Sequence, residues 1–214
     1  MLKGYGGLFV TSPLPVNVPG FWEEIYQAGR AGWDLGKPAA TFQRLLASGE
    51  LAPGRLLVVG AGRGHDAREF ARHGFEVTAV DFAADAVQAM AQLADAQAPV
   101  EAVQADIFAL PPAFDHQFDT LLEYTCFCAI DPARRGEYAD VAARVLKPGG
   151  TLVALFFPMD GPAGGPPFAV TEAEVLALFG TRGFRLVRSE RPDDSVEQRR
   201  GMEELMIFRA PGGA

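Results

Sequence analysis

The sequence predicts an α/β fold in which a seven-stranded, mostly parallel sheet carries helices on both faces. From Arg55 onward, short apolar segments of strand length alternate with segments of helical periodicity. These apolar segments are nearly continuous, which is typical of parallel strands that are buried on both faces. Several of them end in a glycine or an acid, at the edge where such sheets bind ligands.

The first fifty residues precede this alternation. Residues 1–20 are rich in glycine and proline, and we expect them to form a flexible arm. A helix is predicted over residues 21–30, and a second helix follows a turn at 36–38 and runs to about residue 48. The first helix places four side chains on one face: Phe21, Trp22, Ile25 and Tyr26. We expect residues 21–214 to form a single domain, in which residues 21–50 form a helical lid.

The remaining elements follow in order along the chain. Strands are expected at 55–60, 75–81, 98–106, 116–125, 151–158, 184–190 and around 202–209. Helices are expected at 65–74, 82–96, 131–146 and 171–180. The segment LKPGG at 146–150 predicts a tight turn, and residues 160–167 form a loop rich in glycine and proline. The last two strands are expected to pair as an antiparallel hairpin.

Composition and charge narrow the function classes. The net charge of −8 and the isoelectric point of about 4.9 disfavour nucleic acid as a partner, because an acidic surface repels phosphate. No apolar run is long enough to span a bilayer, and the N-terminus does not resemble a signal peptide, so we expect a cytoplasmic protein. Cys126 and Cys128 are expected to be packed, reduced thiols, and no metal site is predicted.

A glycine-rich turn after the first strand is the first candidate for a ligand site. Gly60, Gly62 and Gly64 lie between the first strand and its helix, where glycine lets a ligand approach the backbone and the helix offers free N–H groups. Asp81 ends the second strand, where a carboxylate can accept hydrogen bonds from both hydroxyls of a ribose. These residues alone fit both an NAD-dependent dehydrogenase and an S-adenosylmethionine-dependent methyltransferase.

Three later features favour the methyltransferase. Asp106 ends the third strand, where an acid can bind the adenine amino group. The LKPGG segment before a strand recurs in class I methyltransferases, and the closing hairpin matches the end of their sheet. The expected architecture is therefore the seven-stranded, Rossmann-like class I methyltransferase sheet with an antiparallel last strand.

A series of motifs in order resembles the thiopurine methyltransferase superfamily, and most of all its thiol/halide (thiocyanate) branch. The motifs are WEEIYQAGRAGWDLGKPA, VVGAGRGHDA, the acid of AVDF, FDTLLEYTCFCAIDP, LKPGG, the GGPPF loop and QRRG. The resemblance implies S-adenosyl-L-methionine as cofactor, with S-adenosyl-L-homocysteine as product. It implies cofactor contacts at Trp22, Tyr26, Trp33, Gly60, Gly62, Asp81, Asp106, Ile107 and Tyr124.

The acceptor side is expected to include Phe127, the neighbouring Cys126 and the loop that carries Phe168. Phe168 stands where many enzymes of the thiol/halide branch have Tyr, so one hydroxyl is missing from that loop. Arg199 and Arg200 could attract an anionic acceptor, but a solvated basic turn is the interpretation that the sequence favours. The histidines have no evident partner, so no catalytic acid or base is assigned.

The predicted reaction is S-methylation of a small thiol or of an inorganic sulfur or halide anion, such as thiocyanate or bisulfide. Such soft anions are already nucleophilic, so alignment could suffice for catalysis. A thiopurine-type aromatic thiol is the alternative acceptor. A dehydrogenase, or a protein that only binds the cofactor, are the alternatives from other classes.

Overall fold

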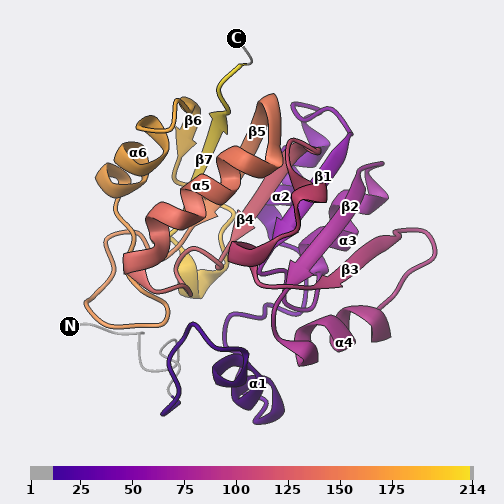
Figure 1. The fold of residues 1–214 in the computed structure, drawn as a ribbon, viewed down its shortest axis with the longest axis vertical. Helices are drawn as coiled ribbons and strands as arrows, with labels where there is room; N and C mark the ends of the chain where they lie inside the picture. Colours follow the sequence, from indigo (N-terminus) through magenta and orange to yellow (C-terminus); the bar gives the residue numbers. More distant parts are fainter. Residues whose placement is uncertain (1–11, 213–214) are drawn as a thin grey trace.

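A seven-stranded sheet forms the centre of the computed structural model, which describes residues 12–212 (Figure 1). The strands follow the spatial order β3-β2-β1-β4-β5-β7-β6. Only β7 runs antiparallel, and it pairs with β5 on one side and β6 on the other. The strands are β1 (Arg55–Val59), β2 (Glu76–Asp81), β3 (Val100–Gln104), β4 (Phe118–Tyr124), β5 (Leu146–Phe156), β6 (Arg185–Glu190) and β7 (Glu204–Arg209). The predicted sheet, with its antiparallel last strand, is confirmed.

Helices cover both faces of the sheet, as predicted. The α-helices are α1 (Pro19–Gln27), α2 (Ala40–Ala47), α3 (His65–Arg72), α4 (Ala84–Gln92), α5 (Arg135–Val145) and α6 (Glu172–Gly180). Short 3-10 helices are η1 (Ile107–Ala109), η2 (Pro112–Phe114), η3 (Pro132–Arg134) and η4 (Glu197–Arg199). Each helix described between residues 12 and 212 is too short or too polar to cross a bilayer.

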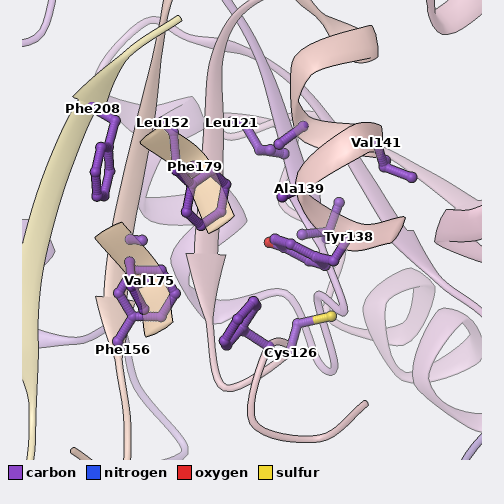
Figure 2. Packing of buried hydrophobic residues seen from close by; sticks show 14 of the residues in the cluster. Leu121, Cys126, Tyr138, Ala139, Val141, Leu152, Phe156, Val175, Phe179 and Phe208 are labelled. Atoms are coloured by element: carbon purple, nitrogen blue, oxygen red, sulfur yellow. The ribbon is translucent and has the colours of Figure 1, made fainter. Parts of the chain in front are cut away.

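The two faces of the sheet build two separate cores, because successive side chains of a strand point to opposite faces. In β1, Leu57 and Val59 join the core beneath α5 and α6, whereas Leu56 and Val58 join the core beneath α2 and α3. Figure 2 shows the first core, in which Phe179 of α6 lies near Leu152 and Phe208. All four of these β1 side chains are buried, which explains the unbroken apolar run in the sequence.

Helix α1 lies at the edge of the sheet where the parallel strands end. Its apolar face, formed by Phe21, Trp22 and Ile25, packs against Ala83 and Ala86 at the beginning of α4. Figure 1 shows α1 beside α4 at the lower end of the molecule. Helix α2, by contrast, is part of the core, so the two helices of the expected lid have different surroundings.

Both predicted boundaries of the first helix need correction. The helix begins at Pro19 rather than residue 21, because the fixed φ of proline suits a first helical turn, and it ends at Gln27 rather than residue 30. Residues 12–18 of the expected arm contain no helix or strand, and residues 1–11 of that arm lie outside the described part.

The LKPGG segment is not a tight turn before β5 but its first part. Leu146 pairs with Phe118 and Thr151 with Thr120, so three extra residues form a bulge on the β5 side. Gly149, with φ of 71°, occupies this bulge, and its N–H donates to the carbonyl of Pro211.

Truncating the core side chain of Phe179 should destabilise the domain strongly. Phe179 is fully buried and packs against Phe156, Phe184 and Phe208. We expect Phe179→Ala to lower the free energy of unfolding by about 3–5 kcal/mol in chemical denaturation. Leu176→Ala, at an exposed position of the same helix, should change it by only about 0.5 kcal/mol. Equal losses would contradict the assignment of the buried face of α6.

Candidate functional site

The site begins at the turn between β1 and α3. Gly60, Gly62 and Gly64 all have positive φ, and Gly64 is the N-cap of α3. A Cβ atom on Gly60 would lie 2.7 Å from Sγ of Cys126, in the loop after β4. Glycine at this position therefore serves both the backbone conformation and the close packing of the β4 loop against the turn.

Asp81 holds this turn from the end of β2. Its Oδ2 accepts from the N–H of Gly62 at 2.9 Å, and its Oδ1 accepts from the N–H of Ala83 at 3.0 Å. Burial raises the pKa of Asp81, and the N–H groups of Ala83 and Gly62 oppose that shift by stabilising the charged form. Each oxygen of an ionised carboxylate has a further lone pair, so this group can still accept from two ribose hydroxyls.

Asp106, after β3, lies on the same edge of the sheet. Its Oδ1 accepts from the N–H of Phe108 at 2.9 Å and caps η1. One carboxylate oxygen is thus used for local structure, and the other can accept a hydrogen bond from an adenine amino group. Asp106, Ile107 and Phe108 all line the main cavity, together with Asp81 and Gly60.

Three aromatic side chains form another wall of this cavity. Trp33 makes edge-to-face contacts with Trp22 and Tyr26, at centroid distances of 5.4 and 5.3 Å. Trp22 is anchored by its Nε1–H, which donates to the carbonyl of Val16 at 2.8 Å. All three aromatics line the cavity. Such a wall fits a ligand that carries an apolar or cationic group, because aromatic faces attract cations.

A second, smaller cavity adjoins the main one. Trp33, Gly60 and Thr125 line both cavities. Gly62 and Tyr124 line only the smaller one, which also contains the start of α3. The two cavities together bring all nine expected cofactor residues to one region of the sheet edge.

The two expected substrate residues do not line either cavity. Phe127 is fully buried in the core, where its ring packs against Tyr138 and Phe156. Phe168 holds the loop in place through its N–H, which donates to the carbonyl of Cys128 at 2.7 Å. The cavity wall is formed instead by their neighbours Cys126, Cys128, Pro166 and Pro167.

Backbone geometry explains the position of Phe127. Thr125 has a positive φ of 61°, which ends the alternation of β4 and redirects the chain. The N–H of Phe127 then donates to Oε1 of the buried Glu123 at 2.8 Å. Cys126 and Cys128 therefore face the cavity as free, buried thiols, and burial raises the pKa of Cys128 to about 12.

Arg199 is the main functional candidate that the sequence did not favour. It is only 1% exposed and lines the main cavity, so the interpretation of a solvated turn is wrong for this residue, although Arg200 is exposed. Its guanidinium donates to the hydroxyl of Tyr124 and, at 2.8 Å, to the carbonyl of Trp33. The sequence does contain one signal of a partner for Arg199. Glu203 follows four residues later, and opposite charges at this spacing often pair.

The described residues form no metal site, and one of the histidines has an acidic neighbour. Between residues 12 and 212 no group of three His, Cys, Asp or Glu side chains is arranged to hold a metal ion. His65 does have an acidic neighbour, because its Nε2 lies 3.2 Å from Asp34. Burial nevertheless lowers the pKa of His65, and this residue lines the smaller cavity.

Replacing Asp81 should weaken binding of S-adenosylmethionine. We expect Asp81→Asn to raise the dissociation constant about ten- to a hundredfold, because hydrogen bonds to a charged group contribute roughly 1.5–3 kcal/mol. Calorimetric titration measures this effect, and Asp193→Asn at an exposed position is the control for the change in charge. Unchanged affinity in Asp81→Asn would refute the ribose role.

A methyl group on Gly60 should disrupt the site more than the same change at Gly49. Both glycines have positive φ, but nothing lies within 4 Å of a Cβ on Gly49. Gly49→Ala should show only the conformational cost of about 1–2 kcal/mol. Gly60→Ala should be less stable still and lose measurable cofactor affinity, because the added atom collides with Cys126. Equal behaviour of the two variants in denaturation and titration would argue against the tight turn.

Comparisons with known proteins agree with this geometry. The family model of thiopurine S-methyltransferase (TPMT) matches residues 17–210. A probable thiol methyltransferase 2 of Arabidopsis thaliana is 35% identical over 88% of this chain and 84% of its own length. Thiocyanate methyltransferase 1 of Brassica oleracea is 32% identical over 90% and 86% of the two chains. A thiopurine S-methyltransferase of Pseudomonas fluorescens is 29% identical over 77% and 83%.

Solved structures share the fold. A 1,6-didemethyltoxoflavin-N1-methyltransferase of Burkholderia thailandensis, solved with S-adenosylhomocysteine, superimposes with a TM-score of 0.74 at 24% identity. The match covers 95% of this chain and 94% of that one. The family match resolves the choice between a methyl donor and a dinucleotide that the glycine turn and Asp81 left open. This chain belongs to the thiopurine S-methyltransferase family and is an S-adenosylmethionine-dependent methyltransferase.

Proposed function

We propose that this enzyme methylates a small sulfur nucleophile or halide that reacts as an anion, such as thiocyanate, bisulfide or a thiolate. The observation that carries the proposal is the buried guanidinium of Arg199 in the wall of the main cavity. A buried cation attracts an anion strongly, because little water screens the interaction. Relatives named thiol and thiocyanate methyltransferases support the same acceptor class.

The residues of the site fit S-adenosylmethionine. Asp81 would bind the ribose, and Asp106 with Ile107 would bind the adenine. Trp22, Tyr26 and Trp33 would face the sulfonium end, where each aromatic contact contributes about 0.5–2 kcal/mol depending on desolvation. In this proposal α1 and the segment through Trp33 act as a lid, whereas α2 supports α3 from within the core.

Tyr124, one of the expected cofactor contacts, does not line the main cavity. It lines the smaller cavity, where its ring packs against Phe42 at 5.7 Å. Its hydroxyl bonds to Arg199 and Glu203. Tyr124 therefore belongs both to the cofactor region and to the surroundings of the cation on the acceptor side.

The reaction needs alignment more than proton transfer. The cofactor supplies a methyl carbon bound to a positively charged sulfur, which is a good leaving group. A lone pair of the acceptor anion forms the new bond to this carbon while the old carbon–sulfur bond breaks, and its electron pair stays on the departing sulfur. No proton moves when the acceptor is already an anion, so no acid or base is assigned. Positioning of the two reactants can contribute roughly 7–11 kcal/mol.

The position of Phe168 bears on the choice of acceptor. Phe168 does not line the main cavity, so its lack of a hydroxyl removes no polar group from the cavity wall. The substitution therefore gives no reason to exclude a small anion. The apolar lining from Cys126, Ile130 and Phe157 favours an aromatic thiol as the second candidate, as do relatives named thiopurine S-methyltransferase.

Charge and thiol chemistry support two further parts of the proposal. The net charge of −8 favours a small-molecule acceptor over nucleic acid. The two free cysteines support a cytoplasmic location, because thiols stay reduced in the cytosol.

An acceptor panel tests the proposed function. The enzyme is incubated with S-adenosylmethionine and thiocyanate, bisulfide, iodide or a thiopurine, and S-adenosylhomocysteine and the methylated product are quantified. We expect turnover with at least one of the small anions. Turnover with the thiopurine alone would replace the proposal by its alternative, and no turnover despite cofactor binding would overturn it.

Substitution of Arg199 tests the role of the buried cation. Arg199→Gln should raise KM for the anionic acceptor about ten- to a hundredfold, since an interaction with a charged group contributes roughly 1.5–3 kcal/mol. Arg199→Lys keeps the charge and should be affected less. Arg200→Gln removes an exposed charge from the next position and serves as the matched control. Equal KM values for Arg199→Gln and Arg200→Gln would contradict the assignment.

A further inference from the structure

Three polar groups form a buried chain behind the acceptor side of the cavity. The hydroxyl of Tyr124 donates to Oε1 of Glu203 at 2.5 Å and accepts from Nη1 of Arg199. Arg199 and Glu203 are 1% and 2% exposed, and Tyr124 is partly buried. The three residues come from the end of β4, from η4 and from the segment just before β7.

The direction of these hydrogen bonds is fixed by their chemistry. An ionised carboxylate only accepts and a guanidinium only donates, so the hydroxyl between them must donate to Glu203 and accept from Arg199. Burial raises the pKa of Tyr124, so the hydroxyl keeps its proton. The tyrosine thus acts as a spacer, and Nη1 of Arg199 remains 3.7 Å from Oε1 of Glu203.

Another buried arginine, Arg135, shows what a direct pair looks like. Arg135 is 3% exposed, and its Nη1 donates to both carboxylate oxygens of Glu174 at 2.7 and 2.9 Å. This guanidinium does not line a described cavity. Arg199 differs in both respects, because it has no such direct bond to its carboxylate and it lines the main cavity.

Further contacts hold the guanidinium of Arg199 in place. Its Nη2 donates to the carbonyl of Trp33 at 2.8 Å, and its Cζ lies 4.8 and 5.1 Å from the ring centroids of Phe157 and Tyr124. A guanidinium has five N–H groups, so two such bonds leave donors for a ligand. The hydrogen bond to the carbonyl of Trp33 also joins Arg199 to the segment that carries part of the aromatic wall.

We propose that Tyr124 and Glu203 are positioning residues that set how strongly Arg199 attracts the acceptor anion. Tyr124 keeps the guanidinium from closing onto Glu203, and the charge of Glu203 limits the attraction. This inference rests on the proposed function, because it requires an anion to bind beside Arg199.

A nearby acid adds to the same charge balance. Asp66 is partly buried in α3 and accepts from the N–H of Ala39 at 2.8 Å. Burial raises the pKa of Asp66 to about 6, an effect that Arg199 opposes and Glu203 reinforces. Asp66 belongs to α3, the helix that follows the glycine turn, whereas Glu203 does not. A substitution at Glu203 therefore disturbs that helix less than a substitution at Asp66.

Two substitutions should shift anion affinity in opposite directions. In Tyr124→Phe the spacer is lost, Arg199 closes onto Glu203, and affinity for thiocyanate should fall about tenfold. In Glu203→Gln the tyrosine keeps an acceptor while the negative charge disappears, so affinity should rise severalfold. The measurement is calorimetric titration of thiocyanate into the enzyme saturated with S-adenosylhomocysteine, at constant ionic strength.

Tyr138→Phe is the matched control. Its hydroxyl donates to Oε2 of the buried Glu123 at 2.7 Å, so this variant also loses a buried tyrosine–glutamate bond, but neither residue lines the two described cavities. We expect its thiocyanate affinity to match that of the wild type. Thermal unfolding and S-adenosylhomocysteine affinity of all variants report whether fold and cofactor site are retained.

The outcomes separate this inference from the proposed function. Losses of similar size in Tyr124→Phe and Glu203→Gln would reduce both residues to a structural role and overturn the inference, even if the acceptor panel succeeds. Opposite shifts without turnover of any small anion would support the inference and overturn the proposed function. If Tyr124→Phe does not fold, a fall or no change in affinity of Glu203→Gln overturns the inference by itself. Absence of thiocyanate binding to the wild type overturns it as well.

Discussion

The two hydrogen bonds that Asp81 accepts organise the site more than any other interaction. One fixes the turn after β1 through Gly62, and the other fixes Ala83, the N-cap of α4. Helix α1 packs on Ala83 and on the following turn of α4, and α1 carries two of the aromatics of the cavity wall. The carboxylate therefore determines at once where the turn lies, where the covering helix is seated and where a ribose can bind. These same N–H donors lower the pKa of Asp81 and so oppose the effect of burial, which raises it.

The lining of the main cavity combines acidic and basic side chains. Asp81 and Asp106 supply acceptors that suit a nucleoside, whereas Arg199 supplies a buried positive charge. Aromatic and sulfur-containing side chains form much of the remaining lining. This arrangement suits a reaction between a cationic methyl donor and an anion, since their charges cancel as the new bond forms. In the proposed reaction the enzyme brings the two reactants together in line rather than activating either of them.

The fold, and the gathering of the strand-end residues at one edge of the sheet, could be predicted because they depend on local sequence rules. Strands buried on both faces give unbroken apolar runs, and parallel strands bring the residues at their ends, such as Asp81 and Asp106, to one edge. Phe127 was assigned to the substrate from its position in a motif, but the positive φ of Thr125 turns it into the core. No sequence rule announces such a φ at a threonine.

The remaining differences arise from contacts between distant segments. Arg199 is an ordinary surface residue by sequence, and its burial depends on Trp33, Tyr124 and Phe157, which come from three other parts of the chain. The LKPGG segment likewise becomes a bulged strand because the N–H of Gly149 donates to the carbonyl of Pro211, more than sixty residues later in the sequence. Periodicity in a single segment carries no information about such partners.

The place of β7 in the sheet has a consequence for how the protein is made. This last strand, Glu204–Arg209, is inserted between β5 and β6, and its side chains complete both cores. Because β7 follows β6 along the chain, β5 and β6 are synthesised before the strand that separates them. Both keep an open edge until β7 has been made, and such edges favour pairing with other chains. Glu203 immediately precedes β7, so a chain that stops before this strand lacks both the partner of β5 and β6 and the carboxylate beside Arg199.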